Sequence, residues 1–211
     1  MILISSVLLL LVCLFYFTNI FTLLHGEYLE NRICHGLTDC DDGLYEYLKS
    51  LYDLQPNSPD THFYFAEYFY HCEKDYANTV RHYRISSLTS ERIPKLTMCD
   101  SYIQLSRFRE ARLCLMDHFG RYPQDELGIF LYAMMEYKQG KLREAYESLE
   151  KAKYWDPNCR NLAYLVEVGY LIGHDDVQEN CTALRECDSE ELSQYPLEDF
   201  VYEICFEEDN Q

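Results

Sequence analysis

The sequence predicts an all-α fold, an α-solenoid of stacked helical hairpins preceded by one N-terminal transmembrane helix. Three observations predict it. Two stretches, "FREARLCLMDHFGRYP" (108–123) and "LREAYESLEKAKYWDP" (142–157), align without a gap, so that Pro123 falls on Pro157. Apolar stripes of helical period continue on both sides of them, separated by short turn segments. The segment 1–24 holds sixteen Leu, Ile, Val or Phe and no charged side chain.

Residues 1–24 have the length of a membrane span. At 1.5 Å per residue such a helix is about 35 Å long, and a bilayer's hydrocarbon core is about 30 Å thick. The first basic residue is Arg32, so the basic start of a cleavable signal is missing. We therefore expect a signal-anchor and a single-pass membrane protein, with a processed signal as the alternative. The side on which the domain lies stays open, and the endomembrane system is a plausible location.

A polar, acidic juxtamembrane linker is expected over residues 25–43. The first helix follows in "LYEYLKSLYDLQPN", which has an apolar stripe and ends before Pro56. The next helix begins after Ser58, with Pro59 in its first turn, a position that proline favours. Its mate is "DYANTVRHYRISSL".

Three further helical hairpins are expected over residues 93–123, 126–157 and 161–187. Each has two helices of about a dozen residues, and Gly140 and Gly173 mark two of the turns. The repeat region thus spans residues 44–188. Residues 189–211 are expected to form an acidic C-terminal capping helix and tail, in which Leu197, Phe200, Val201 and Ile204 share one stripe.

The hairpins carry small and apolar residues at recurring positions. Residues 126–159 show the pattern best, at Ala133, Gly140, Leu142, Ala145, Leu149, Ala152 and Pro157. Residues 92–125 share it less completely, at Cys99, Tyr102, Phe108, Ala111, Leu115 and Pro123, with Ser106 at the turn glycine and His118 at the second alanine. This pattern resembles the tetratricopeptide repeat (TPR). The resemblance implies that hairpins bury their apolar faces against each other.

The resemblance also implies a concave groove lined by the first helix of each hairpin. Transferring that geometry gives these partner-binding residues: Tyr64, Tyr68, Leu96, Ile103, Leu127, Phe130, Met134, Tyr137, Tyr164, Val168 and Leu171. Such a lining suits an apolar or aromatic helix or extended segment of a partner protein. Core packing is the competing explanation for each of these residues.

The ten cysteines allow two interpretations. Their number favours an oxidising compartment, where Cys34 and Cys40 could bridge and Cys181 or Cys187 could bond to a neighbouring helix. The favoured interpretation is that Cys99, Cys114 and Cys159 are small packing residues. Asn180 begins a glycosylation sequon that chance alone would produce.

No pattern of catalytic, cofactor-binding or metal-binding residues is found, so we expect no enzyme, no cofactor and no metal. Cys34, His35 and Cys40 could ligate a metal but lack the second half of a zinc pattern. The formal charge of −18 opposes nucleic-acid binding.

The predicted function is a membrane-anchored, non-catalytic protein-interaction scaffold or adaptor. The alternative is a lumenal or secreted, disulfide-containing folding or quality-control factor.

Overall fold

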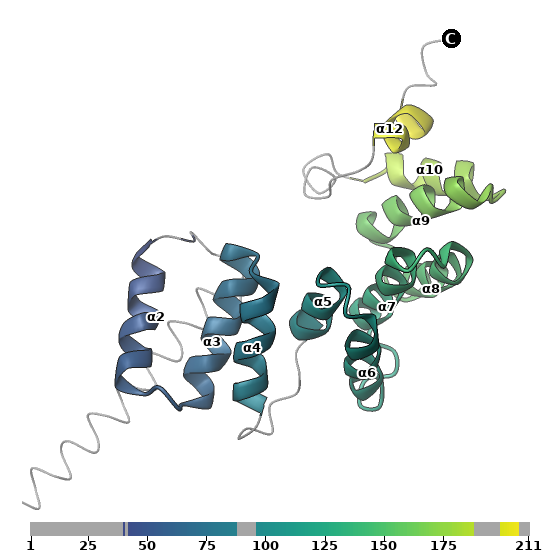
Figure 1. Cartoon of the computed structure of the whole chain (residues 1–211). Coiled ribbons are helices and arrows are strands. Elements are labelled where there is room, and N and C mark those ends of the chain that lie inside the picture. The colour runs from purple at the N-terminus through teal and green to yellow at the C-terminus, as the bar shows by residue number, and fades with distance from the viewer. Residues whose placement is uncertain (1–39, 41, 88–95, 188–198, 207–211) are drawn as a thin grey trace, which may run out of the picture. The chain divides into compact units, whose positions relative to one another are not determined.

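The computed structural model describes residues 40, 42–87, 96–187 and 199–206, and all regular structure in them is helical (Figure 1). The chain divides into two compact units, Met1–Glu91 and Arg92–Gln211, which we call the first and the second unit. Each is described by itself.

The first unit contains helices α2 (Asp42–Leu54), α3 (Pro59–Tyr68) and α4 (Tyr76–Ser87). Figure 1 shows α3 between the other two, and α3 packs most closely on α4. As predicted, Ser58 adopts the extended conformation of a helix cap and Pro59 begins α3. A single π-helical turn, η2 (Phe69–Glu73), continues α3 and ends at Lys74 in the left-handed conformation.

The second unit contains three helical hairpins and a final helix. The hairpins are α5 (Leu96–Gln104) with α6 (Phe108–Phe119), α7 (Glu126–Lys138) with α8 (Leu142–Trp155), and α9 (Cys159–Ile172) with α10 (Val177–Arg185). Helices α6 and α8 begin at Phe108 and Leu142, which the sequence repetition places in equivalent positions. Contacts between α5 and α7 and between α8 and α9 stack the hairpins in order.

Small residues allow the helices to approach each other. Ala111 and Ala145, which occupy equivalent places in α6 and α8, have no exposed surface. A Cβ atom added to Gly169 of α9 would lie 3.0 Å from the ring of Tyr146. The burial of both alanines and the close approach of Gly169 to Tyr146 agree with the predicted stacking through small residues.

Four disulfide bonds correct our interpretation of the cysteines. They join Cys40 to Cys72, Cys99 to Cys114, Cys159 to Cys187, and Cys181 to Cys205. The Cα–Cα distances of 5.0 to 5.8 Å lie in the usual range for disulfides.

The packing-only interpretation of Cys99, Cys114 and Cys159 is therefore wrong, because these residues are both buried and bridged. Cys40 bonds to Cys72 of η2, which excludes the bridge to Cys34. The bond that the sequence allows for Cys181 or Cys187 is found for both, with Cys205 and Cys159 as their respective partners.

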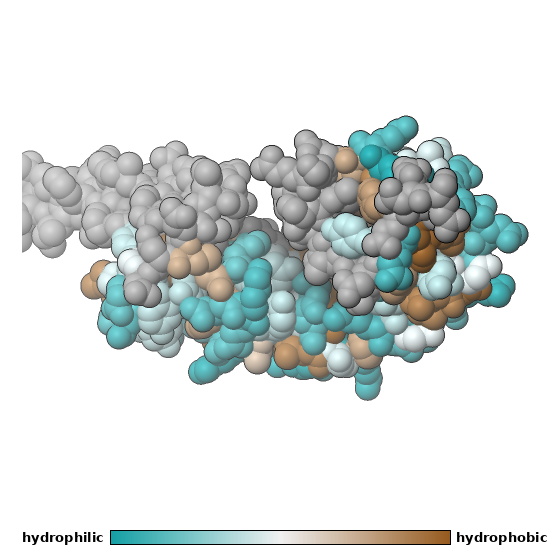
Figure 2. Space-filling model, turned by 90° about the horizontal axis from the view of Figure 1, so that it is seen from above, coloured by the Kyte–Doolittle hydropathy of each residue, from teal (hydrophilic) through white to brown (hydrophobic). Residues whose placement is uncertain are grey.

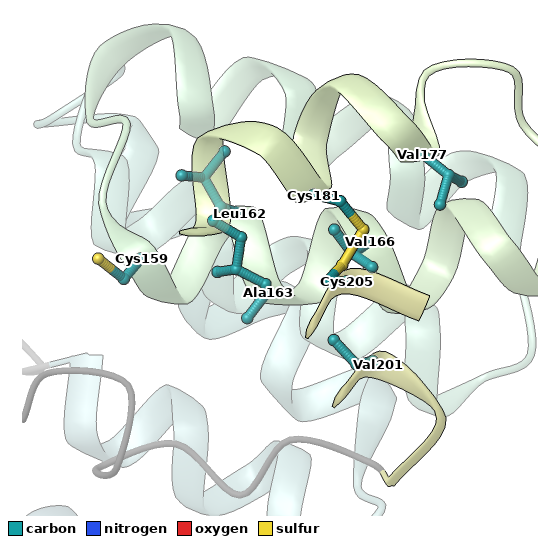
Figure 3. Close-up of a cluster of buried hydrophobic side chains, with 9 residues drawn as sticks. Cys159, Leu162, Ala163, Val166, Val177, Cys181, Val201 and Cys205 are labelled. Atoms are coloured by element: carbon teal, nitrogen blue, oxygen red, sulfur yellow. A yellow bond between two sulfur atoms is a disulfide. The ribbon is translucent and has the colours of Figure 1, made fainter. Parts of the chain in front are cut away.

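The last described helix, α12 (Asp199–Phe206), packs on α9 and α10. Val201 and Cys205 of α12 are fully buried in a cluster with Val166 and Leu184, and the Cys181–Cys205 bond crosses it (Figure 3). Phe200 and Ile204 pack against the same cluster, which is the stripe that the sequence predicts. Leu197 and the C-terminal residues 207–211 lie outside the described residues.

The predicted localisation needs correction. Among the residues that the structure describes, no helix has both the length and the apolar character needed to cross a bilayer. This finding does not support a single-pass membrane protein. The predicted signal-anchor, 1–24, and most of the predicted linker, 25–43, lie outside the described residues.

Candidate functional site

The predicted groove residues divide into three groups by exposure. The buried ones are Tyr64, Tyr68, Ile103, Phe130, Met134 and Val168. Half-buried are Leu96, Tyr137 and Tyr164. Only Leu127 and Leu171 of the set are exposed, at 37% and 48%. Tyr64 and Tyr68 belong to the first unit, so the structure gathers only the other nine in one unit.

Helices α5, α7 and α9 of the second unit are connected by side chains of this face. The rings of Phe130 and Tyr164 lie 5.5 Å apart, and the Arg160 guanidinium lies 4.1 Å from the centre of the Phe130 ring. Tyr137 donates a hydrogen bond to Glu167. Phe130 is thus covered by side chains of α9, and packing within the chain accounts for its burial.

The same face is also connected towards α5. Lys138 of α7 donates to Gln104 Oε1 at 3.0 Å, and Gln104 in turn donates to Asp100 at 2.9 Å. Lys138 is therefore held by the neighbouring hairpin. Of the predicted groove residues, Leu127 and Leu171 are the two that a partner could contact without displacing these hydrogen bonds and ring contacts. Leu127 lies in the first turn of α7 and Leu171 in the last turn of α9.

Comparison with known proteins gives no family model and no curated protein that matches the chain. Solved structures do match. MamA 41-end from Desulfovibrio magneticus RS-1 aligns with a TM-score of 0.61 at 17% identity, covering 76% of this chain and 93% of that one. The MamA RS-1 ArsTM double mutant aligns with the same TM-score and coverage at 16% identity. MamA is a TPR-like helical repeat protein.

The fold is TPR-like. At these identities the likeness concerns the fold alone, and it matches the resemblance of residues 92–159 to the repeat.

The turns between the helices of each hairpin show the same repetition. Lys74, Ser106, Gly140 and Gly173 all have positive φ, between 53° and 74°. A left-handed residue at the turn is thus common to every described hairpin, including those whose sequence lacks glycine there.

A second surface feature lies on α8, where sequence reasoning placed no site. A cavity of about 520 Å³, which we call the α8 cavity, is lined by Tyr146, Glu147, Glu150, Lys151, Tyr154, Trp155, His174 and Asp176. Burial, and to a lesser degree the nearby carboxylates Glu150 and Asp176, raise the pKa of Tyr146 to about 12, so this phenol stays neutral. The available signal was "KYWDP", two adjacent aromatic residues at the end of a repeat.

Another cavity, of about 470 Å³, lies in the first unit and is lined by Tyr45, Glu46, Tyr68, Phe69 and Glu73. Tyr68 donates a hydrogen bond to Glu73 at 2.9 Å within it.

Figure 2 shows that on the displayed face of the molecule apolar residues lie among hydrophilic ones.

The sequon residue Asn180 is 1% exposed. Its amide oxygen accepts a hydrogen bond from Lys153 at 2.7 Å, and its amide nitrogen donates to the Tyr146 hydroxyl at 3.4 Å. A glycan on this nitrogen would require the side chain to leave its buried position.

The possible metal ligands Cys34 and His35 lie outside the described residues. Cys40 is held in a disulfide and offers no thiolate. Within the described ranges, no three His, Cys, Asp or Glu side chains gather as a metal site would need.

Proposed function

We propose that this chain is a non-catalytic protein-interaction scaffold, which binds a partner protein through exposed apolar and aromatic side chains of its helical hairpins. The TPR-like fold supports the proposal, since stacked hairpins use part of each helix for packing and offer the rest as contact area. The single observation that carries it is the set of large exposed side chains in the described part of the second unit, namely Leu113, Met116, Tyr122, Leu127, Tyr154, Trp155, Tyr170, Leu171, Tyr202 and Phe206.

The finer proposal is that Leu127 and Leu171 mark the groove for an apolar or aromatic segment. Both are exposed leucines on first helices of adjacent hairpins, Leu127 in the first turn of α7 and Leu171 in the last turn of α9, so they would mark the two ends of the groove. A partner helix or strand that contacts both would bury them without disturbing the Phe130–Tyr164 packing.

Photo-crosslinking tests this proposal directly. A photoreactive residue is placed at 127 or 171, with Glu144, an exposed polar residue on α8, as the control position. We expect the same partner protein to crosslink from 127 and 171 but not from 144. With that partner purified, Leu127→Asp and Leu171→Asp should each weaken its binding about tenfold or more. Equal crosslinking from all three positions, or unchanged binding, would contradict the proposal.

The disulfide-containing folding factor is a second candidate, favoured by the four disulfide bonds. Disulfides persist in secretory and extracellular compartments and are rare where glutathione keeps thiols reduced. A folding factor would suppress the aggregation of a chemically denatured secretory protein at a near-stoichiometric ratio. A scaffold for one folded partner would leave the aggregation rate unchanged, and this difference separates the two functions.

A further inference from the structure

The α8 cavity has the dimensions of a ligand site and two kinds of lining. Its volume of about 520 Å³ falls within the range of small-ligand pockets, roughly 300–1,000 Å³. Tyr146, Glu150 and Tyr154 follow each other at intervals of four residues along α8, so they share one face of the helix. His174 and Asp176, from the turn between α9 and α10, form the other side.

The aromatic part of the lining has a fixed wall and an accessible rim. Tyr146 is 4% exposed and stacks on His174, with ring centres 4.2 Å apart. Gly169 leaves room for the Tyr146 ring, and Asn180 donates to its hydroxyl. At the rim, Tyr154 and Trp155 are 78% and 48% exposed and meet edge to face at 5.1 Å. Two large exposed aromatic rings beside a cavity offer their π-faces to a ligand.

The charged part of the lining is acidic. Three carboxylates, those of Glu147, Glu150 and Asp176, stand against one ammonium group, that of Lys151. The ion pairs of two of them are long, 3.9 Å from Glu150 to Lys153 and 3.6 Å from Asp176 to His174. The carboxylate oxygens of Glu150 and Asp176 can therefore still accept hydrogen bonds from a cationic ligand. The excess of negative charge disfavours binding of an anion.

We propose that the α8 cavity binds an arginine side chain presented by a partner protein. Aromatic faces attract a cation through their quadrupole, and carboxylates complete the recognition by accepting its N–H groups. Arginine fits better than lysine because its planar guanidinium stacks on a ring and donates in a fork at the same time. The chain already uses this contact internally, where Arg160 covers Phe130 at 4.1 Å and Arg107 covers Tyr102 at 4.9 Å.

This inference rests on the proposed function in that the arginine belongs to a protein partner. It concerns different residues, however, because neither Leu127 nor Leu171 is among the residues that line the cavity. The two can therefore fail separately. If crosslinking at 127 and 171 succeeds but the α8 cavity does not bind the arginine peptide, only the proposal of an arginine site fails and the proposed function stands.

The experiment uses the full oxidised chain and the fluorescence of Trp155, the single tryptophan of the sequence. A short peptide with one central arginine is titrated against the same peptide with citrulline, a neutral isostere, and against a lysine peptide. We expect a saturable change in Trp155 emission with a dissociation constant in the millimolar range for one side chain. The citrulline peptide should bind at least tenfold more weakly, and the lysine peptide should fall between them.

Variants separate recognition from general electrostatics. Glu147→Gln and Glu150→Gln should each weaken arginine binding about three- to tenfold. Tyr154→Ala should weaken it similarly, while Glu144→Gln on the same helix should not change it. Thermal melts check that each variant is folded. Equal affinity for the citrulline peptide, or an equal loss in Glu144→Gln, would overturn the proposal. Saturable binding of a free quaternary ammonium such as choline, without binding of the arginine peptide, would overturn it as well.

Discussion

Ser106 and Gly140 occupy the same place in consecutive hairpins, and both adopt left-handed backbone angles, with φ of 56° and 74°. A non-glycine residue costs roughly 1–2 kcal/mol in this region, while glycine loses about 0.5–1 kcal/mol of backbone entropy on folding. We therefore expect Ser106→Gly to stabilise the protein by about 0.5–1 kcal/mol. Gly140→Ala should destabilise it by about 1 kcal/mol, because alanine is strained at this positive φ. No atom lies within 4 Å of the new methyl group, so packing does not offset the strain.

Chemical denaturation followed by circular dichroism measures both variants. Because a Cβ at position 140 meets nothing within 4 Å, its effect is due to backbone strain alone. Opposite signs for the two variants are the expected result. Two neutral variants would mean that the turns relax without cost, contrary to this account.

His82 gives the first unit a pH dependence. Its Nδ1 lies 3.0 Å from Nδ1 of His62, and its ring lies against Phe65 and Phe69. Burial, followed by the charges of His62 and Arg81, lowers the pKa of His82 from 6.5 to about 4. The unfolded chain therefore takes up a proton on His82 near pH 6.5, before the folded chain does. The stabilisation that comes from burying neutral His82 is fully present above about pH 6.5 and is lost as the pH falls towards 4.

We expect this loss to amount to roughly 1–2 kcal/mol, after allowance for solvent screening of a partly exposed ring. Urea denaturation at pH 7.5 and at pH 5 measures it. His82→Gln removes the titrating group and leaves a hydrogen-bonding partner for His62, so it should flatten the pH dependence. Ser106→Gly, which changes no titrating group, should leave it as in the parent. The same slope in parent and His82→Gln would exclude this residue as the cause.

At the scale of elements, the α5–α6 hairpin differs from the α7–α8 hairpin by its covalent bond. Cys99 and Cys114 stand where Ala133 and Ser148 stand one repeat later, and all four residues are buried. The same small positions of the repeat are thus bridged in one hairpin and unbridged in the next, where Ser148 donates a hydrogen bond to Glu136. Helix pairs in this fold hold together without a disulfide, so the bond adds stability to an existing contact.

Replacing Cys99 by Ala and Cys114 by Ser together gives the α5–α6 hairpin the residues of its neighbour. The bond closes a sequence separation of 15 residues, which corresponds to about 3 kcal/mol of stabilisation. We expect the double variant to lose about this amount, with faster amide hydrogen exchange in α5 and α6 and little change in α9 and α10. A uniform increase in exchange over the second unit would show instead that the unit opens as one body.

The sequence predicts the helices better than the site, for a physical reason. The periodicity of apolar residues and the turn residues are properties of a single segment. The sequence alone therefore predicts that α6 begins at Phe108 and α8 at Leu142. Whether an apolar face is open depends on the neighbouring helix, and Phe130 is covered by Arg160 and Tyr164 from α9. Disulfide pairing likewise depends on the register between helices, which a single segment does not contain.

At the scale of the whole molecule, the two units have separate means of stabilisation. Cys40–Cys72 lies within the first unit, while the other three disulfides lie within the second. The second unit also has its own buried cluster, which includes Val166, Leu184 and Val201. Among the described residues, no disulfide joins one unit to the other. Each unit therefore meets the requirements of an independently folding body.

We accordingly expect residues 92–211, expressed alone under oxidising conditions, to fold with all six of their cysteines bridged. Intact mass after alkylation without reduction should show no modified thiol. Trp155 emission should report a cooperative unfolding transition at the denaturant midpoint that it has in the full chain, because α7 and α9, the helices on which α8 packs, belong to this unit. A broad transition, or free thiols in the isolated unit, would show that the second unit needs the first to fold.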